Sequence, residues 1–313
     1  MKLHTTTMIA MLFSLGALAQ ADSTELTTDS IVPLKSTLTI GAVYANNASY
    51  YGQKAAESTP YAALAATYRL KNGLYLSGST YKLLNDKTST LSAATLGLGF
   101  GFTVAKDLTA DLNVSHSFYP KLSPLLQAGN ANNASAGLTY SKWITVAVTG
   151  DMAFGDVNDG FVTGGLSKSI NLFSISPKDV ITLTPSAEVV AGTQHFYQTY
   201  TETQIIRDSV LKRLNPIFGT LPGTGNGNGN GNGNGNGNNS NNGNGPGTTT
   251  TTTTTERTTE FNLLSYNFRL PLAYNRAQYL VEAAYQLSIL SNNAGTEAGA
   301  ANSFVTLSFY YQF

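Results

Sequence analysis

Two histidines are the first candidates for acid–base chemistry. A histidine becomes a general base when it lies beside a serine or an aspartate and is oriented by a third group. His116 shares its parity with Val114 in an alternating segment, which directs its ring to the apolar side, and His195 lies in an aromatic cluster with Phe196 and Tyr197. No serine shares an inward-facing parity with either ring. The sequence therefore predicts no catalytic residues and no enzyme.

An acidic stretch and a glycine series are the candidates for ion and phosphate binding. Residues 155–160 hold two aspartates, but their spacing does not follow the alternating ligands of a calcium loop, so a hairpin turn is the favoured interpretation. Gly97, Gly99 and Gly101 share a parity, but no helix follows them, so they do not form a phosphate loop. We expect no metal and no cofactor.

Composition limits the classes of partner. The 313 residues carry a formal net charge of zero, so nothing attracts the chain to nucleic acid by charge. Only 12% of the residues are charged, about half the share of a soluble domain, and there is no cysteine. Disulfides, thiolate chemistry and a lipidated cysteine are thereby excluded.

The N-terminal residues resemble an export signal. Lys2 precedes a short apolar run, and Ala19-Gln20-Ala21 offers a cleavage site, which predicts a signal peptide over 1–21. The apolar run is too short for a transmembrane helix. Residues 22–35 would then be a periplasmic N-terminal segment.

Period-two alternation dominates the remainder of the chain. Segments of about ten residues alternate apolar and polar side chains, which is typical of transmembrane strands, and no stretch of about 18 apolar residues occurs. The pattern predicts an all-β, antiparallel, up-and-down transmembrane barrel over 36–313. We expect about twelve strands, at 36–46, 60–70, 74–84, 91–102, 108–119, 131–140, 144–154, 161–171, 180–196, 259–273, 278–290 and 303–313.

The connections alternate in length. Long polar loops follow the odd-numbered strands and mostly short turns follow the even-numbered ones, as in outer-membrane barrels with short periplasmic turns. Residues 198–258 hold a Gly-Asn repeat and a threonine tract, which predict a disordered extracellular loop. Within it, 202–218 has the apolar spacing of a short amphipathic helix. The helix could pack on the rim or gate the mouth.

Turn chemistry predicts register and the charges of the lumen. A turn ending at Gly73 would place Tyr68 opposite Leu76. A two-residue loop at 275–276 would place Arg269 opposite Glu282, and a lipid-facing arginine would cost about 2–4 kcal/mol, so both should face the lumen. The side of Lys168 stays open. The candidate lumen-lining residues are Arg69, Asp111, Glu188, Arg269 and Glu282.

Several stretches of the sequence resemble a known family. Phe313, with Tyr311 and Phe309, resembles the assembly signal of bacterial outer-membrane barrels, which implies recognition by the barrel-assembly machinery. Residues 60–84, 112–120 and 181–197 are similar to Bacteroidota outer-membrane barrels, for which no activity is assigned, so the resemblance implies no site residues.

The predicted function follows from the strand number. Twelve strands leave a narrow lumen, between a filled eight-stranded barrel and an open sixteen-stranded one. We expect a porin-like channel in the bacterial outer membrane for passive diffusion of small polar solutes, with membrane lipid as the surrounding partner. A non-conducting structural or surface-display barrel is the alternative, and an outer-membrane hydrolase is the third.

Overall fold

The computed structural model describes residues 35–86, 89–120, 123–155, 158–195, 260–292 and 298–313, without the side chain of Gln127. The expected signal peptide 1–21, nearly all of segment 22–35, loop 198–258 and helix 202–218 lie outside these residues. Residues 206–258 are a separate unit that is not described.

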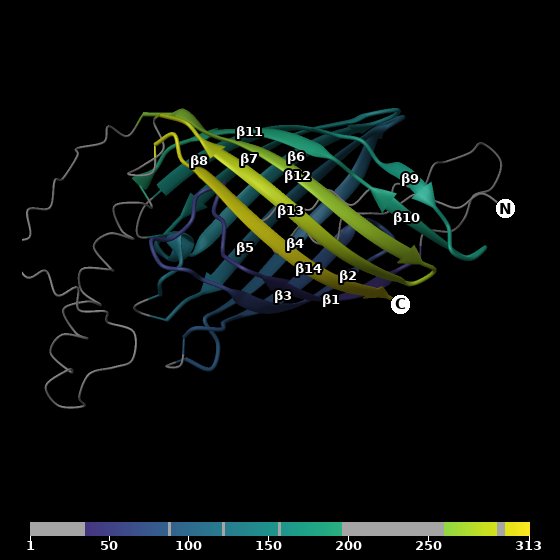
Figure 1. Ribbon diagram of the computed structural model, residues 1–313, viewed down its shortest axis with the longest axis horizontal. Helices are drawn as coiled ribbons and strands as arrows, with labels where there is room; N and C mark the ends of the chain where they lie inside the picture. The colour runs from purple at the N-terminus through teal and green to yellow at the C-terminus, as the bar shows by residue number, and fades with distance from the viewer. Residues whose placement is uncertain (1–34, 87–88, 121–122, 156–157, 196–259, 293–297) are drawn as a thin grey trace, which may run out of the picture. The chain divides into compact units, whose positions relative to one another are not determined.

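The described chain is a closed antiparallel β-barrel (Figure 1). Its strand segments are β1 (Thr37–Ala45), β2 (Tyr61–Arg69), β3 (Leu74–Leu83), β4 (Ala93–Ala105), β5 (Leu108–Phe118), β6 (Asn132–Ser141), β7 (Thr145–Phe154), β8 (Asn158–Ser167), β9 (Ile170–Phe173), β10 (Asp179–Leu183), β11 (Ser186–Gly192), β12 (Asn262–Arg276), β13 (Tyr279–Leu290) and β14 (Ala301–Gln312). A short 3-10 helix, η1 (Leu126–Gly129), precedes β6.

Fourteen segments make twelve wall strands, as the sequence predicts. Neighbours in sequence pair in turn, β1 pairs with β14, and β11 pairs with both β8 and β12, which closes the wall. β10 and β11 are two parts of one strand interrupted at Pro185, because proline has no N–H to donate to the ladder. β8 and β9 are interrupted opposite it, and the Lys168 N–H donates to the Pro185 carbonyl at 3.2 Å.

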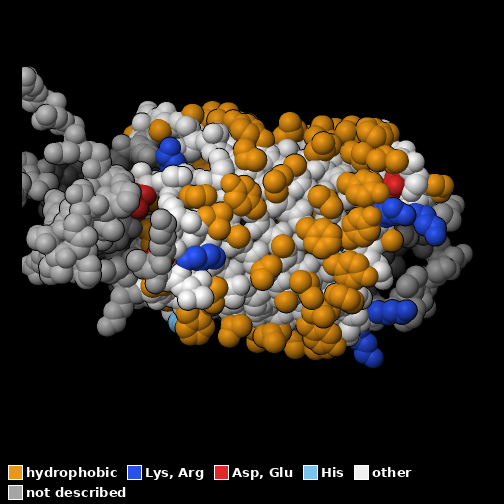
Figure 2. Space-filling view, turned by 60° about the horizontal axis from the view of Figure 1, so that its bottom comes forward, with side chains coloured by type: hydrophobic (Ala, Val, Ile, Leu, Met, Phe, Trp, Pro, Cys, Tyr) orange, Lys and Arg blue, Asp and Glu red, His pale blue; other side chains and the backbone are white. Residues whose placement is uncertain are grey.

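The two faces of the wall differ in chemistry. Along β5, Leu112, Val114 and Phe118 are exposed while Asn113 is buried, and the other wall strands mostly alternate in the same way, apart from β9 and β10. Because the exposed parity is apolar and the other parity faces the enclosed side, we call the latter the lumen face. Figure 2 shows hydrophobic side chains over the outer wall. Among the described residues, no helix is long and apolar enough to cross a membrane.

The turn registers are partly as predicted. Tyr68 is opposite Leu76, and the Leu70 N–H donates to the Leu74 carbonyl at 2.8 Å, so the Gly73 turn is confirmed. The turn predicted at 275–276 is wrong: β12 continues to Arg276, which pairs with Tyr279. Ala277 takes the left-handed conformation, with φ of 49°, so the reversal lies two residues later.

Three inward aromatic rings lie over glycines on neighbouring strands. Tyr310 is opposite Gly41, Tyr75 is opposite Gly99 and Phe161 is opposite Gly192. A Cβ added at Gly41 would stand 2.6 Å from the Tyr310 ring. Glycine at these positions therefore lets large rings lie flat against the wall instead of filling the middle of the lumen.

Candidate functional site: the lumen and its inward loop

Two groups of charged residues lie on the lumen face of β2, β5, β11, β12 and β13. In the first, the Tyr75 hydroxyl donates to Asp111 Oδ1 at 2.8 Å, and the Arg69 guanidinium lies 4.5 Å from the Tyr75 ring centroid. A Cβ at Gly101 would stand 2.7 Å from Arg69 Nη1 and 3.1 Å from Asp111 Oδ2. Arg69 on β2 and Asp111 on β5 thus lie on either side of Gly101 on β4, which has no side chain.

The second group is an ion pair between neighbouring strands. Arg269 Nη2 lies 2.6 Å from Glu282 Oε1, and both side chains are nearly buried. They are diagonal in the sheet, because Arg269 is opposite Gln286 and Glu282 is opposite Ala273. Glu188 lies on the lumen face of β11, next to β12.

Several polar atoms of the lumen face have no protein partner among the described residues. They include Asp111 Oδ2, Asn113 Oδ1, Asn267 Oδ1 and Arg269 Nε. Buried polar atoms almost always find a protein partner or an ordered water, because desolvation without a partner costs about 1–3 kcal/mol each. Within the described chain, neither a protein partner nor a water molecule reaches these atoms, so they belong to polar side chains packed along the lumen face.

The loop between β1 and β2, residues 46–60, folds into the barrel, and we call it the inward loop. The Ser265 hydroxyl donates to the Tyr51 carbonyl at 2.8 Å, and Asn302 Nδ2 donates to the Gly52 carbonyl at 3.2 Å. Gly52 has φ of +85°, and a Cβ there would stand 2.6 Å from Asn267 Oδ1. The loop therefore crosses from its own strands to β12 and β14.

Aromatic stacking secures the tip of the inward loop. The rings of Tyr51 and Phe161 are stacked with centroids 3.9 Å apart, and Tyr50 meets Phe161 edge-on at 5.7 Å. Tyr51 also hydrogen bonds with Asp151 on β7. Burial raises the pKa of both loop tyrosines well above its usual value, so their hydroxyls stay protonated at neutral pH.

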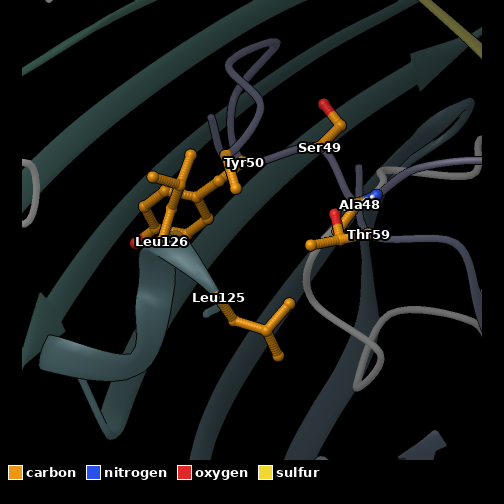
Figure 3. A pocket seen from close by; sticks show the side chains of 7 residues that line it. Ala48, Ser49, Tyr50, Thr59, Leu125 and Leu126 are labelled. Carbon is orange, nitrogen blue, oxygen red and sulfur yellow. Dashed lines mark hydrogen bonds between the residues drawn. The ribbon is translucent and has the colours of Figure 1, made fainter. Parts of the chain in front are cut away.

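The inward loop also meets η1. Figure 3 shows Ala48, Ser49, Tyr50 and Thr59 of the loop facing Leu125 and Leu126 around a hollow too narrow for a water molecule. The Ala48 N–H donates to Thr59 Oγ1 at 3.1 Å, which fixes the base of the loop. Two apolar clusters, one on each side of the mouth, bury Tyr50 with Leu126 and Leu125 with Tyr61. The mouth at the long-loop end is thus constricted by packed side chains.

An aspartate–histidine contact lies at the same end. His195 Nδ1 is 3.0 Å from Asp159 Oδ1, although the sequence predicts an aromatic belt around His195. The same oxygen accepts from Thr193 Oγ1 at 2.6 Å and from the His195 N–H at 2.7 Å, and Asn130 Nδ2 donates to Oδ2 at 2.9 Å. Because this one buried carboxylate binds Asn130, Thr193 and His195 together, Asp159 connects the segments before β6 and after β11. The sequence does not reveal it because 36 residues separate the pair.

The other candidates for chemistry remain apart. His116 is exposed on the outer wall, where its Nδ1 lies 2.7 Å from Asn132 Oδ1. The turn in the acidic stretch is shorter than the predicted 155–160, because β8 already begins at Asn158. In the described ranges, no cluster of three or more histidine, aspartate or glutamate side chains is arranged to hold a metal ion.

Two aromatic girdles border the outer wall. At the short-turn end the exposed rings are Tyr68, Phe100, Phe102, Tyr140, Trp143, Phe173, Phe309 and Phe313, and at the long-loop end they are Tyr44, Phe118, Phe154, Tyr266, Phe268 and Tyr285. Exposed leucines and valines lie between the girdles. A closed barrel with this exterior satisfies every backbone group inside lipid, and such barrels lie in outer membranes. The chain is an outer-membrane β-barrel.

The comparisons with known proteins concern the fold. No family model matches the chain, and no curated protein matches it in sequence. Among solved structures, a KdgM porin is similar at 8% identity, covering 88% of this chain and 99% of that one, with a TM-score of 0.43. An outer membrane channel from Pseudomonas putida F1 is 13% identical, covering 90% and 97%, with a TM-score of 0.42. A NanC porin is 6% identical, covering 88% and 98%, with a TM-score of 0.41.

Proposed function

We propose that the protein is a narrow, porin-like channel for passive diffusion of small polar solutes across the outer membrane. The observation that carries the proposal is the polar lumen face, which holds amide and charged side chains such as Asp111, Asn113, Asn267 and Arg269. The interior of a dry, sealed fold is filled mostly with apolar side chains, and the lumen face here is not. We infer that water occupies the lumen and that polar solutes share its path.

The inward loop sets the size limit in this proposal. It crosses the lumen at the long-loop end, where Tyr51 stacks on Phe161 and Gly52 is held by Asn302. A passage beside packed rings admits small solutes and excludes large ones. We place the long-loop end outside the cell, because outer-membrane barrels keep their short turns in the periplasm.

Conductance across a planar bilayer tests the proposal. The full chain should give small, stable single-channel steps, and Tyr51→Ala should enlarge them because it removes one ring of the stack without altering a wall strand. Tyr68→Ala is the matched control, since Tyr68 is exposed on the outer wall. A chain lacking 198–258 should conduct as well. If neither the full chain nor the chain lacking 198–258 conducts, the channel proposal is overturned.

A specific observation also favours the alternative, a non-conducting structural barrel. One of the two apolar clusters at the mouth buries Tyr50, Phe161 and Leu264 around the inward loop, which is the packing of a plug. If only Tyr51→Ala conducts, the native barrel is sealed and this alternative holds.

A hydrolase is the weakest of the three candidates. Asp159 orients the His195 ring, but within the described residues no serine or threonine hydroxyl hydrogen bonds with that ring as a nucleophile would. Similarity to Bacteroidota barrels and recognition of Phe313 by the barrel-assembly machinery stay predictions. The lumen role of Arg69, Asp111, Glu188, Arg269 and Glu282 belongs to the same channel proposal.

A further inference from the structure

The short-turn end of the barrel carries a concentration of basic side chains. Figure 2 shows Lys and Arg side chains gathered at the right-hand end, where Figure 1 places the chain's C-terminus and the β9–β10 hairpin. Seven exposed basic residues lie there among the described ones: Lys35, Lys71, Lys106, Lys142, Lys168, Lys178 and Arg276. The acids at this end are Asp107, which is exposed, and Asp179, which is buried.

The β9–β10 hairpin projects from this end, and we call residues 170–183 the spur. β7 ends its pairing with β8 at Thr145, so β9 pairs only with β10 among the described strands. All four side chains of β9 are exposed. Ile170, Leu172, Phe173 and Ile175 therefore continue the apolar outer wall past the end of its neighbouring strands.

Trp143 and two lysines lie next to the spur. Trp143, in the β6–β7 turn, is 72% exposed, which is the highest value among the large apolar side chains of the described chain. Lys168 Nζ lies 5.4 Å from the centroid of its ring. Lys142 precedes Trp143 and is exposed.

The two ammonium groups are available to a ligand. Within the described part of the chain, neither Lys142 Nζ nor Lys168 Nζ makes an ion pair with an acid. The nearby acid, Asp107, accepts the Ser141 N–H through its backbone carbonyl at 2.8 Å but pairs with neither lysine. A lysine over an aromatic ring keeps its N–H donors for a third group.

We propose that Lys142, Trp143, Lys168 and the spur form a binding site for anionic phospholipids of the periplasmic leaflet. The apolar spur is continuous with the lipid-facing wall, so its occupant is lipid and not a protein strand. The indole lies at the depth of the lipid headgroups, an interface that suits a ring with an apolar body and a polar N–H. The two ammonium groups bind the headgroup phosphate. This inference rests on the barrel lying in a membrane with its short turns on the periplasmic side, but not on whether its lumen conducts.

The single tryptophan of the chain makes the site directly measurable. The full-length protein would be reconstituted in phosphatidylcholine vesicles that contain equal mole fractions of brominated phosphatidylglycerol or brominated phosphatidylcholine. Bromine quenches tryptophan only at close range. The anionic lipid should quench Trp143 more strongly, with each lysine contributing about five-fold to its local enrichment.

Charge-removing variants locate the preference. Lys168→Gln and Lys142→Gln should each reduce the excess quenching, and the double variant should abolish it. Lys71→Gln is the matched control, because it removes the same charge at the same end but two hairpins away. A loss of the preference in Lys71→Gln would show a general effect of the basic end and would overturn the site.

The remaining outcomes are equally decisive. Equal quenching by the two lipids would overturn the anionic preference while leaving the membrane position intact. No quenching by either lipid would place Trp143 outside the bilayer, which would overturn the site and the assigned membrane depth together. Channel conductance would be unaffected in both cases, so the two proposals fail separately.

Discussion

Arg269 on β12 and Glu282 on β13 form a 2.6 Å ion pair although four residues of register separate them. Removal of one partner leaves a nearly buried charge alone, so Glu282→Gln or Arg269→Gln should destabilise the folded barrel by about 3 kcal/mol. The Arg269→Gln/Glu282→Gln double variant should recover most of that loss. Refolding equilibria in detergent across a urea series measure all three, and a double variant as unstable as the sum of both would contradict the pairing.

Ion selectivity should favour cations. The basic residues of the strands' lumen face and the inward loop are three, against six acidic ones: Arg69, Arg269 and Lys54 against Glu57, Asp111, Asp151, Asp159, Glu188 and Glu282. A charged wall in a narrow lumen attracts counter-ions. The reversal potential in a KCl gradient of about ten-fold should therefore have the sign of potassium permeation.

Neutralising lumen acids should weaken that selectivity. Asp151→Asn with Glu188→Gln should move the reversal potential toward zero. Asp107→Asn with Glu260→Gln is the control, because it removes the same charges from exposed positions outside the lumen. An anion-selective wild-type channel would refute the charge argument.

A valine at Gly99 should be costly. Its side chain would occupy the position of the Tyr75 ring, which would have to leave the wall and break its 2.8 Å hydrogen bond to Asp111. We expect a loss of about 1–3 kcal/mol in folding stability, as for overpacked cores. Gly164→Val is the control, because Gly164 is on the outer wall and no atom lies within 4 Å of the place that its Cβ would take. The measurement is the temperature midpoint of the heat-induced change in gel mobility. Gly99→Val should lower this midpoint and Gly164→Val should leave it unchanged.

Acid should loosen the spur. Asp179 accepts from the N–H groups of Ile175 and Ser176 at 2.7 and 2.9 Å, and the hydrogen bonds from the Ser176 hydroxyl and these amides lower the pKa of Asp179 to about 2. A pKa lowered by folding gives stability that is present above the unfolded value near about 4 and is lost as pH falls toward about 2. Amide exchange at Ile175 and Ser176, corrected for intrinsic rates, should lose protection across that window.

Asp179→Asn separates this cause from general acid unfolding. The variant should show weak protection of the two amides at every pH, while the β13–β14 amides stay protected. If amides all over the wild-type barrel lose protection equally at low pH, the cause is general acid unfolding and not the titration of Asp179.

The sequence predicts the wall better than its contents. Alternation identifies the lumen side of Arg269 and Glu282 even though the predicted turn is wrong, because the displacement of two residues on each strand preserves parity. The inward loop escapes prediction because its anchors at Ser265 and Asn302 lie more than 200 residues away. Contacts of that span leave no periodicity along the chain.

The Gly52–Asn302 contact also orders events in assembly. Strand β1 can close only against β14, and the inward loop that follows β1 takes its hydrogen bond from a residue of that same late strand. The hydrogen bond from Asn302 therefore cannot form until β14 is in place, so the last anchor of the inward loop and the closure of the wall belong to one step of assembly.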